Sequence, residues 1–109
     1  MIKFKALDYK LSPYTGLTRD SWIEAGKYLL EGVFRNVPNM DTPIVVERFE
    51  TEITYPHKNI SKEKLDIQEK AERLEGLARS FFVAAPLIHD NPQIEINGIK
   101  LSEYYKKHI

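Results

Sequence analysis

The sequence predicts an all-α fold with two long helices, the beginning of a third and a long ordered loop between the first two. Apolar residues recur at helical spacing over two long stretches of the chain. Each stretch begins just after a residue type that commonly caps helices, and each has a proline near its end. With 109 residues, of which 42% are hydrophobic and 29% charged, the chain fits one domain over residues 1–109.

The first helix is predicted to begin near Arg19 and to stop before Pro38, after about 18 residues, because proline cannot continue a helix. Thr18 is its N-cap candidate. A broad apolar stripe follows, made of Trp22, Ala25, Leu29, Val33 and Val37 and widened by Ile23, Leu30 and Phe34. Gly26 and Gly32 lie inside this helix and suggest positions where another backbone packs closely.

A long loop, with at most one short strand at residues 44–46, leads to a second helix predicted from Ser61, its capping residue, to about His89. One face of this helix consists of Leu65, Gln68, Ala71, Leu74, Ala78, Phe81 and Ala85. Further apolar residues, Leu77, Val83, Ala84 and Ile88, extend the expected burial around the cylinder. Pro86 is expected to kink or end the helix.

The C-terminal part begins with a predicted hairpin, because "IEINGIKL" alternates apolar and polar residues around Asn97-Gly98, a dipeptide typical of type I′ turns. Ser102 is then expected to cap a third helix of about two turns. A stable helix usually runs longer and packs an apolar face. We therefore expect this chain to be the N-terminal piece of a larger protein.

Composition excludes several classes of function. Lys plus Arg and Asp plus Glu number 16 each, so the formal net charge is zero and no basic field attracts nucleic acid or anionic lipid. There are no cysteines, and the three histidines, His57, His89 and His108, share no face, so neither a metal nor a cofactor is predicted. No stretch has the apolar length of a signal peptide or a membrane span, which predicts a cytoplasmic protein without a membrane partner.

The loop segment "RFETEITYP" carries one candidate site, formed by Arg48, Glu50, Glu52 and Tyr55. Alternate residues of this segment could face one cavity and present carboxylates beside a phenol. Hydrolysis of a glycosidic bond commonly uses two carboxyl groups, one protonated and one ionised. The alternative is a solvated loop whose charges pair with nearby lysines.

Glu75 and Arg79 form the second candidate, since residues four apart share a helix face. They are either a surface ion pair or part of a pocket wall in which Arg79 presents a fixed fork of donors to a sugar hydroxyl or carboxylate. Aromatic side chains could add stacking on a sugar ring, although Trp22 and Phe81 lie on stripes that are expected to be core.

Five ordered segments, "SPYTGLTRDSW", "GVFR", "ETEITYP", "EGLARSFFVAAPLI" and "INGIKLSEYY", resemble the start of the bacterial proteins grouped as domain of unknown function 2264. The resemblance runs from about Leu11 to Tyr105. It implies a six-hairpin α/α barrel followed by a β-rich region, a carbohydrate-active role, and a connection with glycoside hydrolase family 154, which acts on β-glucuronides.

The resemblance also implies roles for the candidate residues. Tyr55, Glu75 and Arg79 would line the substrate end of the barrel, with Arg79 a partner for a sugar carboxylate, and Glu50 and Glu52 would lie at its rim. One and a half hairpins cannot close a barrel, so the chain alone is expected to be inactive. The alternative is a non-catalytic helical module that forms homo-oligomers through the apolar faces that a barrel would cover.

Overall fold

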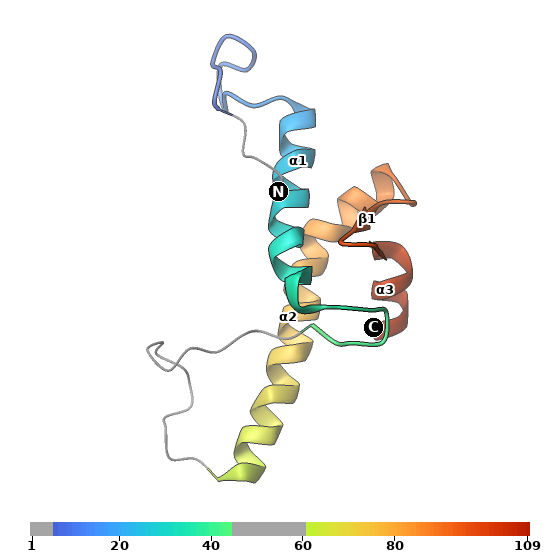
Figure 1. Cartoon of the computed structure of the whole chain (residues 1–109). Helices are drawn as coiled ribbons and strands as arrows, with labels where there is room; N and C mark the ends of the chain where they lie inside the picture. The colour runs from blue at the N-terminus through green and yellow to red at the C-terminus, as the bar shows by residue number, and fades with distance from the viewer. Residues whose placement is uncertain (1–5, 45–60) are drawn as a thin grey trace.

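The computed structural model describes residues 6–44 and 61–109, which form a mostly helical fold with one very small sheet (Figure 1). The elements in chain order are α1 (Arg19–Val33), the 3₁₀ turn η1 (Phe34–Asn36), α2 (Lys62–Asp90), β1 (Glu95–Ile96), β2 (Ile99–Lys100) and α3 (Leu101–His108). Both α1 and α3 contact α2. Strand β1 contacts α1, and strand β2 contacts α3. The predicted all-α character is confirmed at this level.

Helix α1 begins where its capping signal predicts. The Thr18 hydroxyl accepts a hydrogen bond from the Ser21 N–H at 3.3 Å. The α-helix ends at Val33, and the 3₁₀ turn carries the chain on to Val37, directly before Pro38. The sequence therefore predicted both ends of this helix to within a few residues.

The two glycines of α1 differ in their surroundings. A Cβ on Gly26 would lie 3.1 Å from a methyl carbon of Leu87, so α2 approaches α1 closely there, through a side chain and not through its backbone as expected. Among the described residues, a Cβ on Gly32 would meet nothing within 4 Å. The interpretation of Gly32 as a packing site was therefore wrong.

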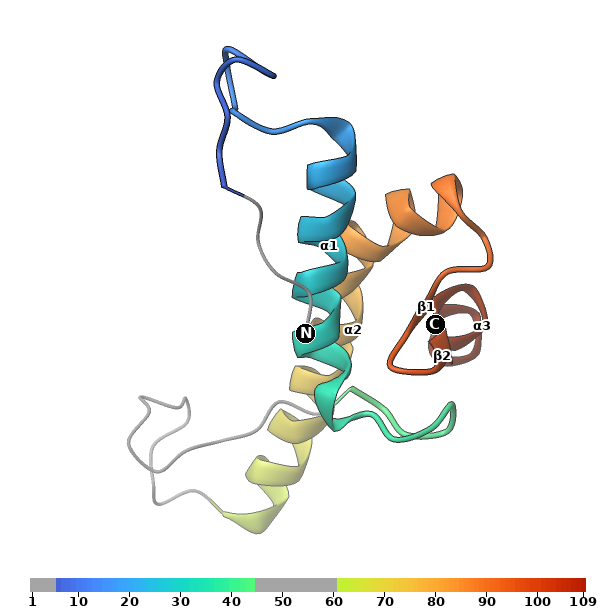
Figure 2. The same ribbon diagram turned by 45° about the horizontal axis from the view of Figure 1, so that its top comes forward.

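Helix α2 begins after Ser61, whose hydroxyl accepts a hydrogen bond from the Lys64 N–H at 3.3 Å, as predicted. It continues through Pro86 to Asp90, so the proline does not end it. The helix axis bends in its second half, as the views in Figures 1 and 2 show. A bend is expected there because Pro86 lacks an N–H and its ring crowds the carbonyl one turn earlier.

The buried side of α2 is not the face that the helical spacing favoured. The residues buried in the core are Leu77, Ser80, Ala84 and Leu87. On the expected face, Ala71, Leu74, Ala78 and Phe81 are exposed. The second half of the helix carries apolar residues on most sides, and the positions of α1 and α3 decide which side is covered.

The predicted burial was also wrong for Trp22 and Leu29 on α1. Both were placed on the core stripe, yet Trp22 is 55% and Leu29 54% exposed. The residues that pack into the core from this region are Leu30 on α1 and Phe34 in η1, which are almost completely buried.

The predicted hairpin is present. Asn97 and Gly98 have φ of 51° and 77°, the left-handed conformations that a type I′ turn requires, and Ile96 pairs with Ile99 across it. Helix α3 follows directly from β2, at Leu101. Ser102 is not its cap, because the Ser102 hydroxyl donates to the Pro92 carbonyl at 3.2 Å.

Helix α3 holds the centre of the core with Tyr104 and Tyr105, which are 0% and 1% exposed. The Phe34 ring meets the Tyr104 ring edge-on with 4.9 Å between centroids. The Tyr105 hydroxyl donates to the Ser80 hydroxyl at 2.6 Å, and the Ser80 hydroxyl donates to the Leu77 carbonyl at 3.1 Å. This chain of hydrogen bonds joins α3 to α2 inside the core.

The same helix binds the loop after α1 at three successive residues. The Tyr104 hydroxyl donates to the Thr42 carbonyl at 2.8 Å, and His108 Nε2 lies 2.8 Å from the Met40 carbonyl, which accepts. Lys107 forms an ion pair with Asp41, and this hydrogen bond and charge lower the pKa of the Asp41 carboxyl. Nothing in the sequence pattern indicated these contacts, since the partners are more than 60 residues apart.

Replacing Gly32 by alanine is expected to stabilise the fold. Alanine favours the helix by up to about 1 kcal/mol over glycine, and the space at Gly32 is open. We expect Gly32→Ala to raise the free energy of unfolding by about 0.5–1 kcal/mol, measured by urea denaturation at a fixed protein concentration. Gly26→Ala is the matched control, because there Leu87 must move. Equal gains from both variants would contradict the close contact at Gly26.

Tyr104 predicts how stability changes at alkaline pH. Burial raises the pKa of Tyr104 to about 12, above the value of about 10 expected in the unfolded chain. Because the pKa is higher in the folded chain, the protonated Tyr104 hydroxyl contributes stability that is fully present below pH 10. This stability is lost as pH rises to about 12. In urea denaturation at several pH values, we expect Tyr104→Phe to flatten the fall in stability over this range. The control is the exposed Tyr14→Phe, and a slope in Tyr104→Phe equal to that of the control would contradict the assignment.

Candidate functional site

Glu75 and Arg79 lie on the surface of α2, where their side chains form the ion pair that their spacing predicted. Both side chains are more than half exposed. In the structure they are a surface pair, next to the exposed Leu74 and Ala78. A role for either residue in binding a sugar stays a prediction.

The other predicted site residues, Arg48, Glu50, Glu52 and Tyr55, lie outside the described residues. The same holds for the proposed strand from Val45 onward and for His57. The assignment of these four residues as a substrate-binding group stays a prediction.

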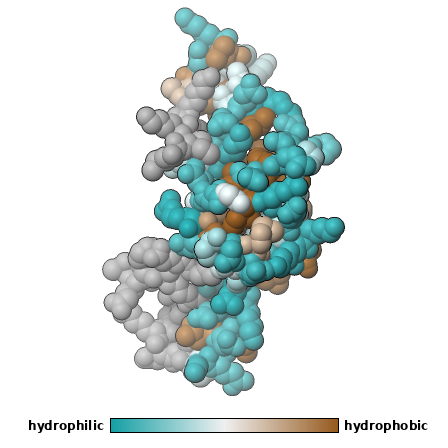
Figure 3. Space-filling model, turned by 45° about the vertical axis from the view of Figure 1, so that its right-hand side comes forward, coloured by the Kyte–Doolittle hydropathy of each residue, from teal (hydrophilic) through white to brown (hydrophobic). Residues whose placement is uncertain are grey.

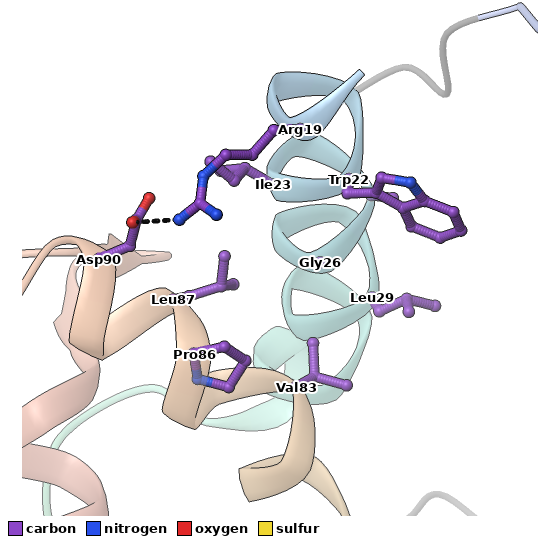
Figure 4. Close-up of a pocket in the computed structure, with 10 residues that line it drawn as sticks. Arg19, Trp22, Ile23, Gly26, Leu29, Val83, Pro86, Leu87 and Asp90 are labelled. Atoms are coloured by element: carbon purple, nitrogen blue, oxygen red, sulfur yellow. Dashed lines mark hydrogen bonds and ion pairs between the residues drawn. The ribbon is translucent and has the colours of Figure 1, made fainter. Parts of the chain in front are cut away.

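A groove lies where α1 crosses the second half of α2, with a volume of about 410 Å³. We call it the crossing groove; its lining includes Arg19, Trp22, Leu29, Val83, Leu87 and Asp90. Most of this lining is apolar. Figure 4 shows Leu87 and Pro86 of α2 facing α1, while Trp22 and Leu29 project from the other side of that helix.

One ion pair borders the crossing groove. Arg19 at the start of α1 reaches toward Asp90 at the end of α2, and its guanidinium lies 2.5 Å from the carboxylate (Figure 4). Arg19 is largely exposed, so the pair adds little to stability. The exposed indole of Trp22 projects on the opposite side of α1 from the Arg19 guanidinium (Figure 4).

A second apolar surface runs along α2. Six of its residues follow one another in alternating steps of four and three, the spacing of a helix interface. We call them the α2 stripe: Ile67, Ala71, Leu74, Ala78, Phe81 and Ala85. Ile67 is 61% and Leu74 68% exposed, and the neighbouring Phe82 is 83% exposed.

The α2 stripe lies about a third of a turn round the helix from the side that enters the core, where Leu77, Ser80 and Ala84 are buried. Figures 1 and 2 show the first half of α2 extending away from the other described helices. Apolar side chains reach the surface of this extending part in the space-filling view (Figure 3). Within the α2 stripe, Ile67, Ala71, Leu74 and Ala78 are exposed, whereas the Phe81 ring contacts the Tyr105 ring of α3 with 5.1 Å between centroids.

A polar pocket of about 490 Å³ lies between α1 and the hairpin, lined by residues that include Lys27, Glu31, Gln93, Glu95 and Asn97. Its charges are of both signs. Among residues 6–44 and 61–109, no group of three or more His, Asp or Glu side chains is arranged to hold a metal ion. No helix in the described part of the chain combines the length and the apolar character that crossing a bilayer requires.

Sequence reasoning missed two features of these surfaces. It placed Trp22 in the core, because periodicity alone could not show that α2 packs beside this position. It also treated the face containing Leu74 as buried, although the regular exchange of large and small residues was visible in the sequence. That exchange is the signal that could have indicated an interface between helices.

Comparison of the chain with protein-family models, with curated proteins and with solved structures found no significant match.

Proposed function

We propose that this chain is a non-catalytic helical interaction module that associates with a second copy of itself through the apolar surface of α2. The observation that carries the proposal is the exposure of Ile67, Leu74 and Phe82 along one helix. Large apolar side chains that gather on an exposed helix typically mark a protein interface. The same surface would be covered by further helices in the barrel that the family resemblance implies.

Electrostatics supports association between identical copies. The formal net charge is zero, so two copies do not repel one another over long distances. The perturbed groups Asp41, Tyr104 and Tyr105 owe their pKa shifts to contacts that hold the fold together: a hydrogen bond from Lys107 for the first and burial for the two tyrosines. These shifts therefore belong to the fold and not to a catalytic centre.

The self-association is tested by the mass of the purified chain in solution. We expect sedimentation velocity to show a species of twice the chain mass that dissociates on dilution, over concentrations from about 1 to 200 μM. Circular dichroism at each concentration checks that the helices remain formed. A folded chain with the mass of a single copy throughout this range would overturn the proposal.

A second candidate function, carbohydrate binding, is favoured by the lining of the crossing groove, which includes the exposed indole of Trp22 and the ion pair of Arg19 and Asp90. Aromatic rings stack on the apolar faces of sugars, and a guanidinium binds carboxylates. The resemblance to carbohydrate-active proteins implies a ligand with a uronic acid, for which either Arg19 or Arg79 is a candidate partner.

Trp22 is the single tryptophan of the chain, so its fluorescence reports on the crossing groove directly. We expect a glucuronic-acid oligosaccharide to change the emission with a saturating dependence on concentration, and the corresponding neutral oligosaccharide to bind less tightly. Arg19→Ala should remove this difference between ligands if the groove binds the carboxylate, and Arg79→Ala should do so if the resemblance holds. No saturable change in emission with either ligand would exclude binding at Trp22.

A further inference from the structure

We infer that α2 pairs with α2 of a second copy in an antiparallel orientation. The two-fold axis crosses the helix pair at the level of position 76. This inference rests on the self-association proposed above and assigns its surface, orientation and register. It starts from the α2 stripe, in which large and small side chains alternate. The large residues are Ile67, Leu74 and Phe81, and the small ones are Ala71, Ala78 and Ala85.

The alternation distinguishes an antiparallel from a parallel pair. In a parallel pair in register, Leu74 would face Leu74 of the second copy, and Ala78 would face Ala78. Successive layers would then be overfilled and empty, and both overpacking and cavities are destabilising. In an antiparallel pair, each large residue can face an alanine, so every layer holds a similar volume. Evenly filled layers allow two helices to approach closely along their length.

One antiparallel register uses all six residues of the α2 stripe. When the two-fold axis crosses the helix pair at the level of position 76, Ile67 faces Ala85, Ala71 faces Phe81 and Leu74 faces Ala78, and each contact occurs twice by symmetry. The paired segment of 19 residues is about 28 Å long. Of the large residues, Ile67 and Leu74 are mostly exposed in the single copy and would be covered.

Glu75 borders the α2 stripe on one side, and Arg79 and Glu72 lie farther round the helix. In an antiparallel pair, this border faces its own symmetry mate. With the two-fold axis at the level of position 76, the two Glu75 residues lie close to one another across the axis. Each is paired with Arg79 of its own helix, which offsets the like charges.

The absence of cysteine from the sequence allows a direct test of the register by disulfide formation. Two single-cysteine variants, Ile67→Cys and Ala85→Cys, are prepared and oxidised separately and then as a mixture. We expect the mixture to form covalent heterodimers and each variant alone to remain unlinked, because residues at the same position lie about 27 Å apart along the pair. Efficient disulfide formation by each variant alone would show a parallel pair and overturn the inference.

Two variants that each introduce a negative charge test which surface of the chain forms the dimer. Leu74→Glu is expected to weaken dimerisation at least about tenfold, because it would place a carboxylate against Ala78 of the second copy. Leu74 is exposed in the single copy, so circular dichroism should show an unchanged helical content. Leu29→Glu is the matched control, an equally drastic change at an exposed leucine on α1. We expect it to leave the dimer intact.

The outcomes separate this inference from the proposed function. If Leu29→Glu weakens the dimer and Leu74→Glu does not, the chain self-associates through the crossing groove and the α2 pairing is wrong. If wild-type chains stay single at all concentrations, the self-association itself is wrong. The inferred surface, orientation and register of the α2 pair would all be supported by two results together. Disulfides would form in the mixture of the two cysteine variants but in neither variant by itself, and Leu74→Glu would weaken the dimer.

Discussion

The burial of Tyr104 and Tyr105 in a helix of only eight residues is the constraint on which the rest of the structure depends. So short a helix is marginal in isolation, and packing must stabilise it. The two rings supply this packing and contact Phe34 at the end of α1. Their hydroxyls donate to the Thr42 carbonyl and to Ser80, so neither phenol is left unsatisfied in the core. One short helix thus ties together α1, α2 and the loop after α1.

This arrangement explains why α2 has an uncovered face. Because α1 and α3 pack on one side of its second half, its other side receives no described element, and the described core ends near Gly76. Ile44 from the loop approaches there, 3.2 Å from the position that a Cβ on Gly76 would occupy. Toward the N-terminus of α2, Leu74 and Ile67 are exposed. Within the described part of the chain, a helix of 29 residues is therefore supported by other elements along only part of its length.

The sequence predicted those features that depend on neighbours along the chain. Thr18 and Ser61 cap their helices, and Asn97-Gly98 forms its turn, because each effect acts within three or four residues. The choice of buried face was wrong for α2, and Trp22 was wrongly placed in the core. A helix that is apolar on several sides has no single periodic stripe, and contacts between residues more than 20 positions apart, such as Tyr105 with Ser80, make the choice. Ser102 satisfied a capping pattern but bonds to Pro92 because the hairpin brings that carbonyl close.

The candidate site shows the same division between local and distant effects. The ion pair of Glu75 and Arg79 followed from spacing alone, whereas its surroundings did not. Glu75 borders the α2 stripe and Arg79 lies farther round the helix, so neither charge interrupts the apolar residues. At a helix interface, bordering charges contribute to partner choice and orientation, while the apolar seam contributes most of the affinity. In the proposed pair the exchange of large and small residues sets the register, and the ion pair of each Glu75 with Arg79 of its own helix offsets the like charges that the two-fold axis brings together.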